Sequence, residues 1–228
     1  MSWAFSMPPI LHLVRHAEGY HNAAWHGEGI HDPFLTEHGQ KQCEKLRQEF
    51  PDHDKIELLM ASPMKRCIQT CRESFKPAVD RLGKILLSPL AQEASTEHMD
   101  TGSSAESIKE AFGDLVDTHR LTDVFPYWNY NVGRFSDDPG MQADRARQLR
   151  CFIMGRPEKH VVLVAHGSFN HCLTGNFDET DGTQTTRMWA NAECRSYRFD
   201  ESSGDQATIV ELEESIKRRP ELNEGMKI

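Results

Sequence analysis

Four short apolar runs, each followed by charged or polar residues, constrain the fold of this chain more than any other feature. The runs span residues 9–14, 56–61, 84–88 and 160–165, and the last of them is the most apolar and β-branched. Continuous apolar runs of this length, without polar alternation, are typical of strands buried on both faces of a parallel sheet. The sequence therefore predicts a central sheet that is covered on both sides.

Helical patterns separate the apolar runs. Residues 36–50 open with a threonine cap and carry apolar residues at three- and four-residue steps. Further helices are expected over 63–75, 104–115 and 141–154, with Ser62 as a helix cap, and a closing hairpin over 195–199 and 207–212. This order predicts an α/β fold, a three-layer α/β/α sandwich with a mostly parallel central sheet.

Length and charge narrow the class further. The 228 residues favour one domain over 1–228, with a catalytic core over about 9–212 and a charged, loosely held tail over 213–228. Lys and Arg number 26 against 35 Asp and Glu, so the net charge of −9 argues against a nucleic-acid partner. The mean hydropathy of −0.62 and the lack of a long apolar run argue against a membrane protein.

Compartment and metal content follow from the N-terminus and from the cysteine and histidine patterns. The N-terminus lacks a signal-peptide pattern and the six cysteines form no C-x-x-C pair, so we expect a reducing, cytoplasmic location. His16, Glu18, His21, His26 and His31 cluster in the sequence, but their spacing matches no metal motif, and no metal is expected. The sequence carries no signal for an oligomeric state.

Reactive side chains follow all four runs. In chain order they are Arg15 and His16, then Arg66, then Glu93, then His166 with Gly167. Because the carboxyl ends of parallel strands meet at one edge of a sheet, we expect these residues to lie together. Arginine forks bind phosphate oxygens, a neutral histidine can attack phosphorus, and a carboxylic acid can protonate a leaving group.

The segment Leu13-Val-Arg-His-Ala-Glu18 resembles the signature of the histidine phosphatase superfamily, which has the phosphoglycerate-mutase-like fold. The resemblance covers about residues 10–200. It continues through Asn22, Leu35-Thr36-x-x-Gly39-x-x-Gln42, Ser62-Pro-x-x-Arg66-x-x-Gln69-Thr70 and Ala165-His166-Gly167.

The resemblance implies a role for each site residue. His16 is implied as the nucleophile that becomes phosphorylated, and the phosphoryl group is implied to be held by Arg15, Arg66 and His166. Asn22 and Gly167 are implied to line the same pocket. Glu93 matches the proton donor, with Glu97 and Asp100 as alternatives. Such enzymes use no metal or cofactor.

Departures from the mutase pattern decide which activity is expected. Gly19 stands three residues past His16, where mutases often carry Ser or Thr, and no Glu-Arg-x-Tyr-Gly segment is present. Residues 95–103 loosely resemble fungal members of the family. These features favour a phosphatase acting on a small organic phosphate monoester. A phosphoglycerate-type mutase and a catalytically silent phospho-ligand-binding module stay open as alternatives.

The aromatic segment Phe125-Pro-Tyr-Trp-Asn-Tyr130 bears on the substrate. It is either a loop pinned down by its own rings or a lid over the strand ends. As a lid, Trp128 and Tyr130 would favour a monophosphate with a bulky or partly apolar organic part. Glu97 and Asp100, if they face the pocket, would disfavour a bisphosphate.

Overall fold

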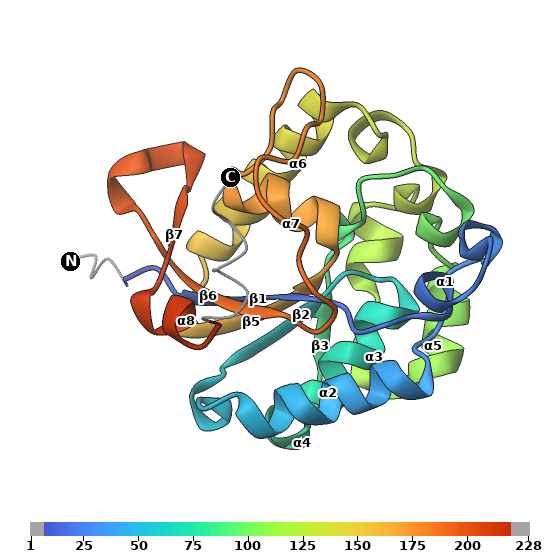
Figure 1. Cartoon of the computed structure of the whole chain (residues 1–228), viewed down its shortest axis with the longest axis horizontal. Coiled ribbons are helices and arrows are strands. Elements are labelled where there is room, and N and C mark those ends of the chain that lie inside the picture. Colours follow the sequence, from blue (N-terminus) through green and yellow to red (C-terminus); the bar gives the residue numbers. More distant parts are fainter. Residues whose placement is uncertain (1–6, 220–228) are drawn as a thin grey trace.

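A seven-stranded sheet runs through the computed structural model, which describes residues 7–219 (Figure 1). The strand order is β4-β3-β2-β5-β1-β6-β7. Every neighbouring pair from β4 to β1 is parallel, whereas β6 is antiparallel to β1, and β7 is antiparallel to β6. The strands are β1 (Ile10–Arg15), β2 (Leu58–Ala61), β3 (Ile85–Leu87), β4 (Val116–Asp117), β5 (His160–Ala165), β6 (Cys194–Phe199) and β7 (Ile209–Glu211). The mostly parallel sheet is confirmed.

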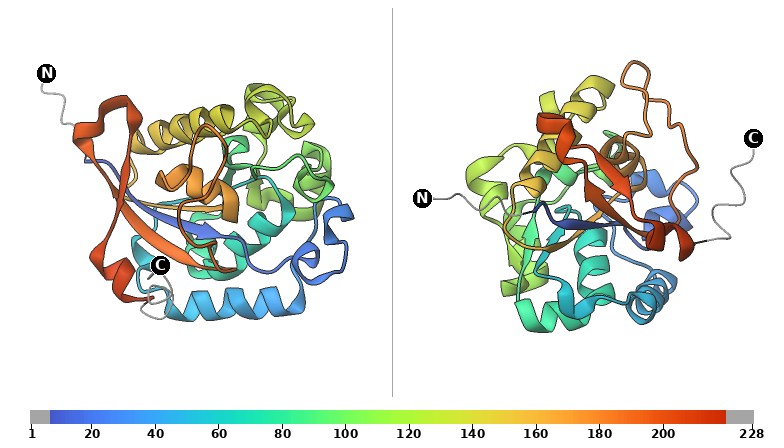
Figure 2. Two further views of the ribbon diagram at one scale, coloured as in Figure 1. Left: turned by 45° about the horizontal axis from the view of Figure 1, so that its top comes forward. Right: turned by 90° about the vertical axis from the view of Figure 1, so that its left-hand side faces the viewer.

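Helices cover both faces of the sheet. In Figures 1 and 2, α2, α3 and α4 lie on one face and α6 and α7 on the other, which confirms the three-layer interpretation. The helices are α1 (Tyr20–Ala23), α2 (Glu37–Glu49), α3 (Lys65–Ser74), α4 (Lys76–Leu82), α5 (Ala105–Phe112), α6 (Pro139–Met154), α7 (Gly167–Thr174) and α8 (Glu213–Lys217). None of the helices within residues 7–219 has the length and apolar character needed to cross a bilayer.

Helix boundaries depart from the predicted ones where the backbone turns. The helix expected to reach residue 115 ends at Phe112, because Gly113 adopts a positive φ of 58°. The chain then makes a short 3-10 turn over Gly113–Leu115 and enters β4. The expectation that Ser62 caps the next helix is wrong. Ser62 still extends the sheet by donating its N–H to the carbonyl of Val164 (2.9 Å), and α3 begins only after Met64.

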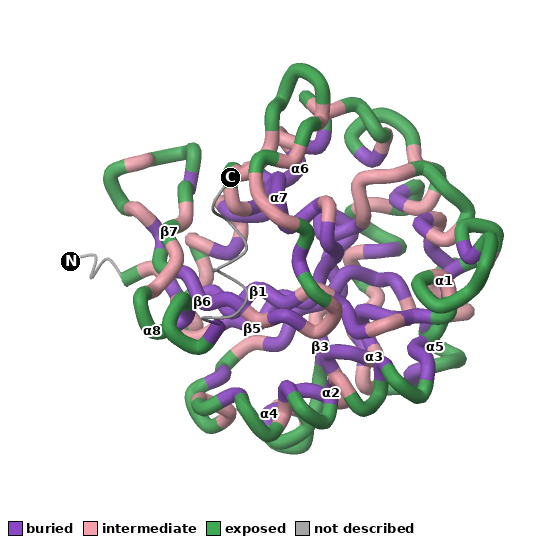
Figure 3. Tube along the Cα trace, in the orientation of Figure 1, coloured by how far each residue is buried: buried purple, intermediate pink, exposed green. Residues whose placement is uncertain are grey.

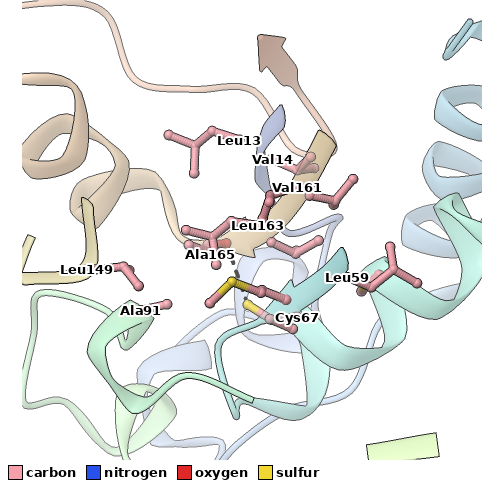
Figure 4. Packing of buried hydrophobic residues seen from close by; sticks show 14 of the residues in the cluster. Leu13, Val14, Leu59, Cys67, Ala91, Leu149, Val161, Leu163 and Ala165 are labelled. Carbon is pink, nitrogen blue, oxygen red and sulfur yellow. Dashed lines mark hydrogen bonds between the residues drawn. The ribbon is translucent and has the colours of Figure 1, made fainter. Parts of the chain in front are cut away.

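The central strands pack mainly apolar side chains against both helical layers. Figure 4 shows Leu59 and Cys67 on the α3 side and Leu149 of α6 with Ala91 on the other side of β5. Figure 3 shows that the central strands are buried and that exposed residues lie along the outer helices and loops. Burying continuous apolar strands between two helical layers accounts for the near absence of polar residues within β5.

The register of the central strands positions the site. Arg15 at the end of β1 pairs with Ala165 at the end of β5, and Ala61 of β2 pairs with Val164. Three strands therefore end side by side, and the residues that follow them meet at one edge of the sheet.

The C-terminal segment is more ordered than the sequence suggests. Instead of a loosely held tail from residue 213, the chain forms α8 with Ser215 buried. Arg219 also pairs with Glu193 and Glu211. These contacts hold residues 213–219 against β6 and β7, while the remainder of the predicted tail, 220–228, lies outside the described residues.

Candidate active site

The strand ends bring two histidines and an arginine into contact. His16 follows β1, His166 follows β5, and Arg66 is the second residue of α3. The rings of His16 and His166 have centroids 5.3 Å apart, and Nη2 of Arg66 lies 3.1 Å from Nδ1 of His166. All three side chains are buried.

The protonation of His16 is set by its own backbone neighbour. Nδ1 lies 2.8 Å from the carbonyl oxygen of Ala17, which can only accept a hydrogen bond. Nδ1 therefore carries the proton, and Nε2 keeps its lone pair. Burial, helped by the charges of Arg66 and Arg15, holds the pKa of His16 well below its ordinary value. The geometry and the low pKa produce a neutral imidazole with a free Nε2.

Residues of the two downstream motifs hold the segment after His16 in place. Ala17 donates its N–H to Thr70 Oγ1 (2.9 Å), and Glu18 donates its N–H to Gln42 Oε1 (2.8 Å). A Cβ on Gly39 would stand only 2.1 Å from the carbonyl oxygen of Glu18, so α2 approaches this closely only with glycine there. These motif residues position the backbone that follows the nucleophile, and the contacts just named are with that backbone rather than with the His16 ring.

The Arg15 side chain lies between the first residue of α7 and the loop that precedes β6. Its Nη1 donates to the carbonyl of Trp189, in the loop that precedes β6. A Cβ on Gly167 would lie 3.1 Å from Arg15 Nε and 2.7 Å from Met188 Sδ. Gly167 therefore leaves room for the arginine between α7 and this loop.

Arg66 is anchored by a buried carboxylate that the sequence offers only as an alternative proton donor. Nη2 of Arg66 lies 2.6 Å from Oδ1 of Asp100, and Nη1 donates to the carbonyl of Met99 (2.8 Å). The other oxygen of Asp100 accepts from Ser95 Oγ. Both oxygens of Asp100 are thus engaged, and its carboxylate holds the guanidinium in position.

Glu93 has the features of an acid. Its Oε1 accepts N–H groups from Ala94 (2.8 Å) and from Phe169 in the first turn of α7 (2.9 Å). These contacts leave Oε2 to carry a proton. Burial, followed by the charge of Asp100, raises the pKa of Glu93 above its ordinary value. Glu97, by contrast, is exposed.

His166 is held by a contact that the sequence does not reveal. Its Nε2 lies 2.8 Å from Oγ of Ser62, the residue wrongly expected to cap a helix. Burial, together with Arg66 and His16, keeps the pKa of His166 well below its ordinary value. The lowered pKa values favour the neutral form of both site histidines.

The predicted pocket residue Asn22 and its neighbour His21 occupy different positions. Asn22 is exposed, and its Oδ1 accepts the N–H of Gly19 (3.1 Å), a turn-capping contact. The His21 ring lies beside the His16 ring, with centroids 5.4 Å apart. The sequence singles out His21 only as part of a histidine cluster.

Residues 7–219 contain no group of three or more His, Cys, Asp or Glu side chains placed to hold a metal ion.

The aromatic segment divides into a buried and an exposed part. Trp128 is 2% exposed, and a Cβ on Gly102 would stand 1.9 Å from its ring, so the expectation that Trp128 offers a surface to a ligand is wrong. Tyr127 and Tyr130 are 68% and 67% exposed, and their rings meet edge to face at 5.7 Å. Asn131 hydrogen bonds to Gln92, so this loop rests on the segment that carries Glu93.

Comparisons with known proteins find a matching family model and curated relatives. The family model described as "Histidine phosphatase superfamily (branch 1)" matches residues 11–212. A probable phosphatase of Schizosaccharomyces pombe is 29% identical over 162 residues, covering 69% of this chain and 73% of the relative. A phosphoglycerate mutase-like protein of Arabidopsis thaliana is 28% identical over 200 residues, covering 73% and 74%.

A solved structure shares the fold at much lower identity. The ecdysone phosphate phosphatase of Bombix mori, determined with tungstate, superimposes with a TM-score of 0.58 at 14% identity, covering 89% of this chain and 92% of that one. At this identity the likeness extends to the fold alone.

Proposed function

The chain belongs to the histidine phosphatase superfamily, and from this membership we propose that it hydrolyses a phosphate monoester through a phosphohistidine formed on His16. The observation that carries the proposal is the hydrogen bond between His16 Nδ1 and the carbonyl of Ala17, which leaves Nε2 free to attack. A phosphatase-type activity follows from the family and its named relatives. The phosphohistidine route and the monoester substrate are our proposal.

In the first step, the Nε2 lone pair of His16 forms a bond to phosphorus while the bond from phosphorus to the ester oxygen breaks. The departing oxygen takes the proton from Oε2 of Glu93, whose raised pKa favours the protonated acid. Arg15 and Arg66 carry positive charge beside His16 and stabilise the equatorial phosphoryl oxygens as charge accumulates on them.

In the second step, water attacks the phosphorus of phosphohistidine. The Glu93 carboxylate accepts a proton from that water, the N–P bond breaks, and the electron pair returns to Nε2 of His16. Inorganic phosphate leaves, and both residues regain their starting protonation. Each proton and electron pair is accounted for by these two side chains and one water molecule.

His166 can carry its ring proton on either nitrogen, so its tautomer can change when a phosphoryl group binds. Nη2 of Arg66 lies 3.1 Å from Nδ1 of His166, and Nε2 of His166 lies 2.8 Å from the Ser62 hydroxyl. Because a hydroxyl can donate as well as accept, Ser62 permits either tautomer of His166. A phosphoryl oxygen that engages Arg66 would thus meet an Nδ1–H donor from His166.

We propose a substrate whose organic part is bulky or partly apolar. The exposed rings of Tyr127 and Tyr130 offer an apolar surface on the loop that rests against the Glu93 segment. The ion pair with Arg66 offsets the charge of Asp100, so Asp100 no longer supports the exclusion of a bisphosphate. The aromatic pair is therefore the feature that supports this preference.

The test is hydrolysis of p-nitrophenyl phosphate in the presence of EDTA, compared between the native protein, His16→Ala and His38→Ala. His38 lies exposed on α2 and serves as the matched control. We expect loss of turnover by about 10³-fold or more only in His16→Ala, because the nucleophile defines the route. Rapid quenching in alkali should trap one phosphate on His16.

Failure of the folded native protein to release phosphate would contradict the proposal. Transfer of the phosphoryl group to a second acceptor in preference to water would favour the mutase. Binding of orthovanadate without turnover of any phosphate ester would favour the silent ligand-binding module.

A further inference from the structure

Two imidazole rings lie next to the His16 nucleophile. Only one of them, that of His166, is among the residues that the sequence implies as phosphoryl-binding. The His166 ring lies 5.3 Å from the His16 ring, and the His21 ring lies at nearly the same distance, 5.4 Å. His21 reaches this position from α1, which begins four residues after His16.

Two glycines make the approach of His21 possible. A Cβ on Gly19 would stand 2.8 Å from both Cε1 and Nδ1 of the His21 ring. A Cβ on Gly27 would stand 2.1 Å from the His21 carbonyl oxygen. The ring therefore fills the space that a side chain at position 19 would take, and Gly19 itself supplies no side-chain donor.

The His21 ring has unused hydrogen-bonding capacity. Its Nδ1 is buried without a hydrogen-bond partner among residues 7–219, an arrangement that is costly unless a ligand or water completes it. Burial, then the charges of Arg66 and Arg15, lower the pKa of His21 to about 3. The ring is consequently neutral, with one N–H to donate, and lies within electrostatic reach of both arginines.

We propose that His21 is a further phosphoryl-binding residue, whose imidazole N–H donates to a nonbridging oxygen of the group transferred to His16. This inference rests on the proposed function. Three equatorial oxygens accumulate charge in phosphoryl transfer, and a neutral donor adds stabilisation without a further charge to desolvate. Arg15, Arg66 and His166 then share that group with a fourth donor.

The first experiment compares His21→Ala, His21→Asn and His21→Gln in hydrolysis of p-nitrophenyl phosphate and in orthovanadate binding measured by calorimetry. Removing one such donor is expected to lower kcat by about 10²-fold. His21→Ala should also bind orthovanadate more weakly. Because Asn and Gln carry an amide N–H at the places of Nδ1 and Nε2, at least one of them should recover much of the loss.

The second experiment displaces the ring without removing it. Gly19→Ala forces the His21 ring away and should reproduce the defect of His21→Ala. Gly29→Ala is the matched control, because a Cβ there meets nothing within 4 Å, and it should behave as the native protein. Melting temperatures check that every variant is folded.

The outcomes separate this inference from the proposed function. An active native protein whose folded His21→Ala variant keeps native kcat and orthovanadate affinity overturns the role of His21 and leaves the phosphatase intact. A native protein that binds orthovanadate but releases no phosphate overturns the phosphatase, and the affinity of His21→Ala then still decides the role of His21.

Discussion

Arg66 and Asp100 form a buried ion pair, with Nη2 of the arginine 2.6 Å from Oδ1 of the carboxylate, although the two residues are 34 positions apart in the chain. The pair joins the start of α3 to the segment that carries Glu93. It orients the guanidinium beside His166. Burial, followed by the negative charge of Asp100, raises the pKa of the nearby Glu93.

Asp100→Asn should therefore change both the rate and its pH dependence. Misplacement of Arg66 is expected to lower kcat/KM by up to about 10²-fold. Loss of the negative charge lowers the pKa of Glu93, so the fall in kcat on the alkaline side should move to lower pH. A pH profile of kcat for native protein, Asp100→Asn and the exposed control Asp114→Asn provides the measurement. An unmoved alkaline limb in Asp100→Asn would contradict the coupling.

Glu93→Gln should separate substrates by their leaving groups. The amide oxygen can still accept the N–H groups of Ala94 and Phe169, but the side chain no longer supplies a proton. We expect hydrolysis of alkyl phosphates to slow by about 10²–10⁴-fold, while p-nitrophenyl phosphate, with its good leaving group, slows far less. Glu97→Gln, at an exposed position, should match the native rates. Equal losses on both substrates would move the acid role away from Glu93.

The aromatic segment should respond differently at its buried and exposed rings. Trp128→Ala is expected to lower the free energy of unfolding by about 3–5 kcal/mol, because it empties a packed site against Gly102. The double variant Tyr127→Ala/Tyr130→Ala should keep native stability and raise KM for aryl or other bulky phosphates. Urea unfolding and steady-state kinetics measure the two effects. Unchanged KM across bulky substrates would argue against the proposed substrate preference.

His12 should make the stability of the fold depend on pH. Burial, then the nearby His160, lower the pKa of His12 from 6.5 to about 3. The unfolded chain takes up this proton near pH 6.5 and the folded protein does not. The free energy of unfolding therefore falls below that pH, by about 1.4 kcal/mol per pH unit for this group. His12→Asn should show a shallower decline in urea unfolding, and His38→Ala should keep the native slope. Identical slopes in His12→Asn and the native protein would disprove this contribution.

Local sequence patterns were enough to predict the sheet and the edge at which the reactive residues gather. Continuous apolar runs that end in Arg15, His16 and His166 are local patterns, and burial of a strand on both faces leaves its signal in consecutive residues. Because parallel strands end at one edge, the gathering of these side chains with Arg66 followed from the same patterns.

Only the contacts of the folded chain show how those residues are held. Whether Asp100 serves as an acid or as the partner of Arg66 depends on a contact across 34 residues, and no periodicity records it. Ser62 contacts His166 across 104 residues. Trp128 and Tyr130 are alike as aromatic residues, and only the packing of Gly102 beneath the first makes one core and the other surface. Hydrogen bonds and burial between remote segments are properties of the folded chain, because they arise only when helices and loops pack around the sheet.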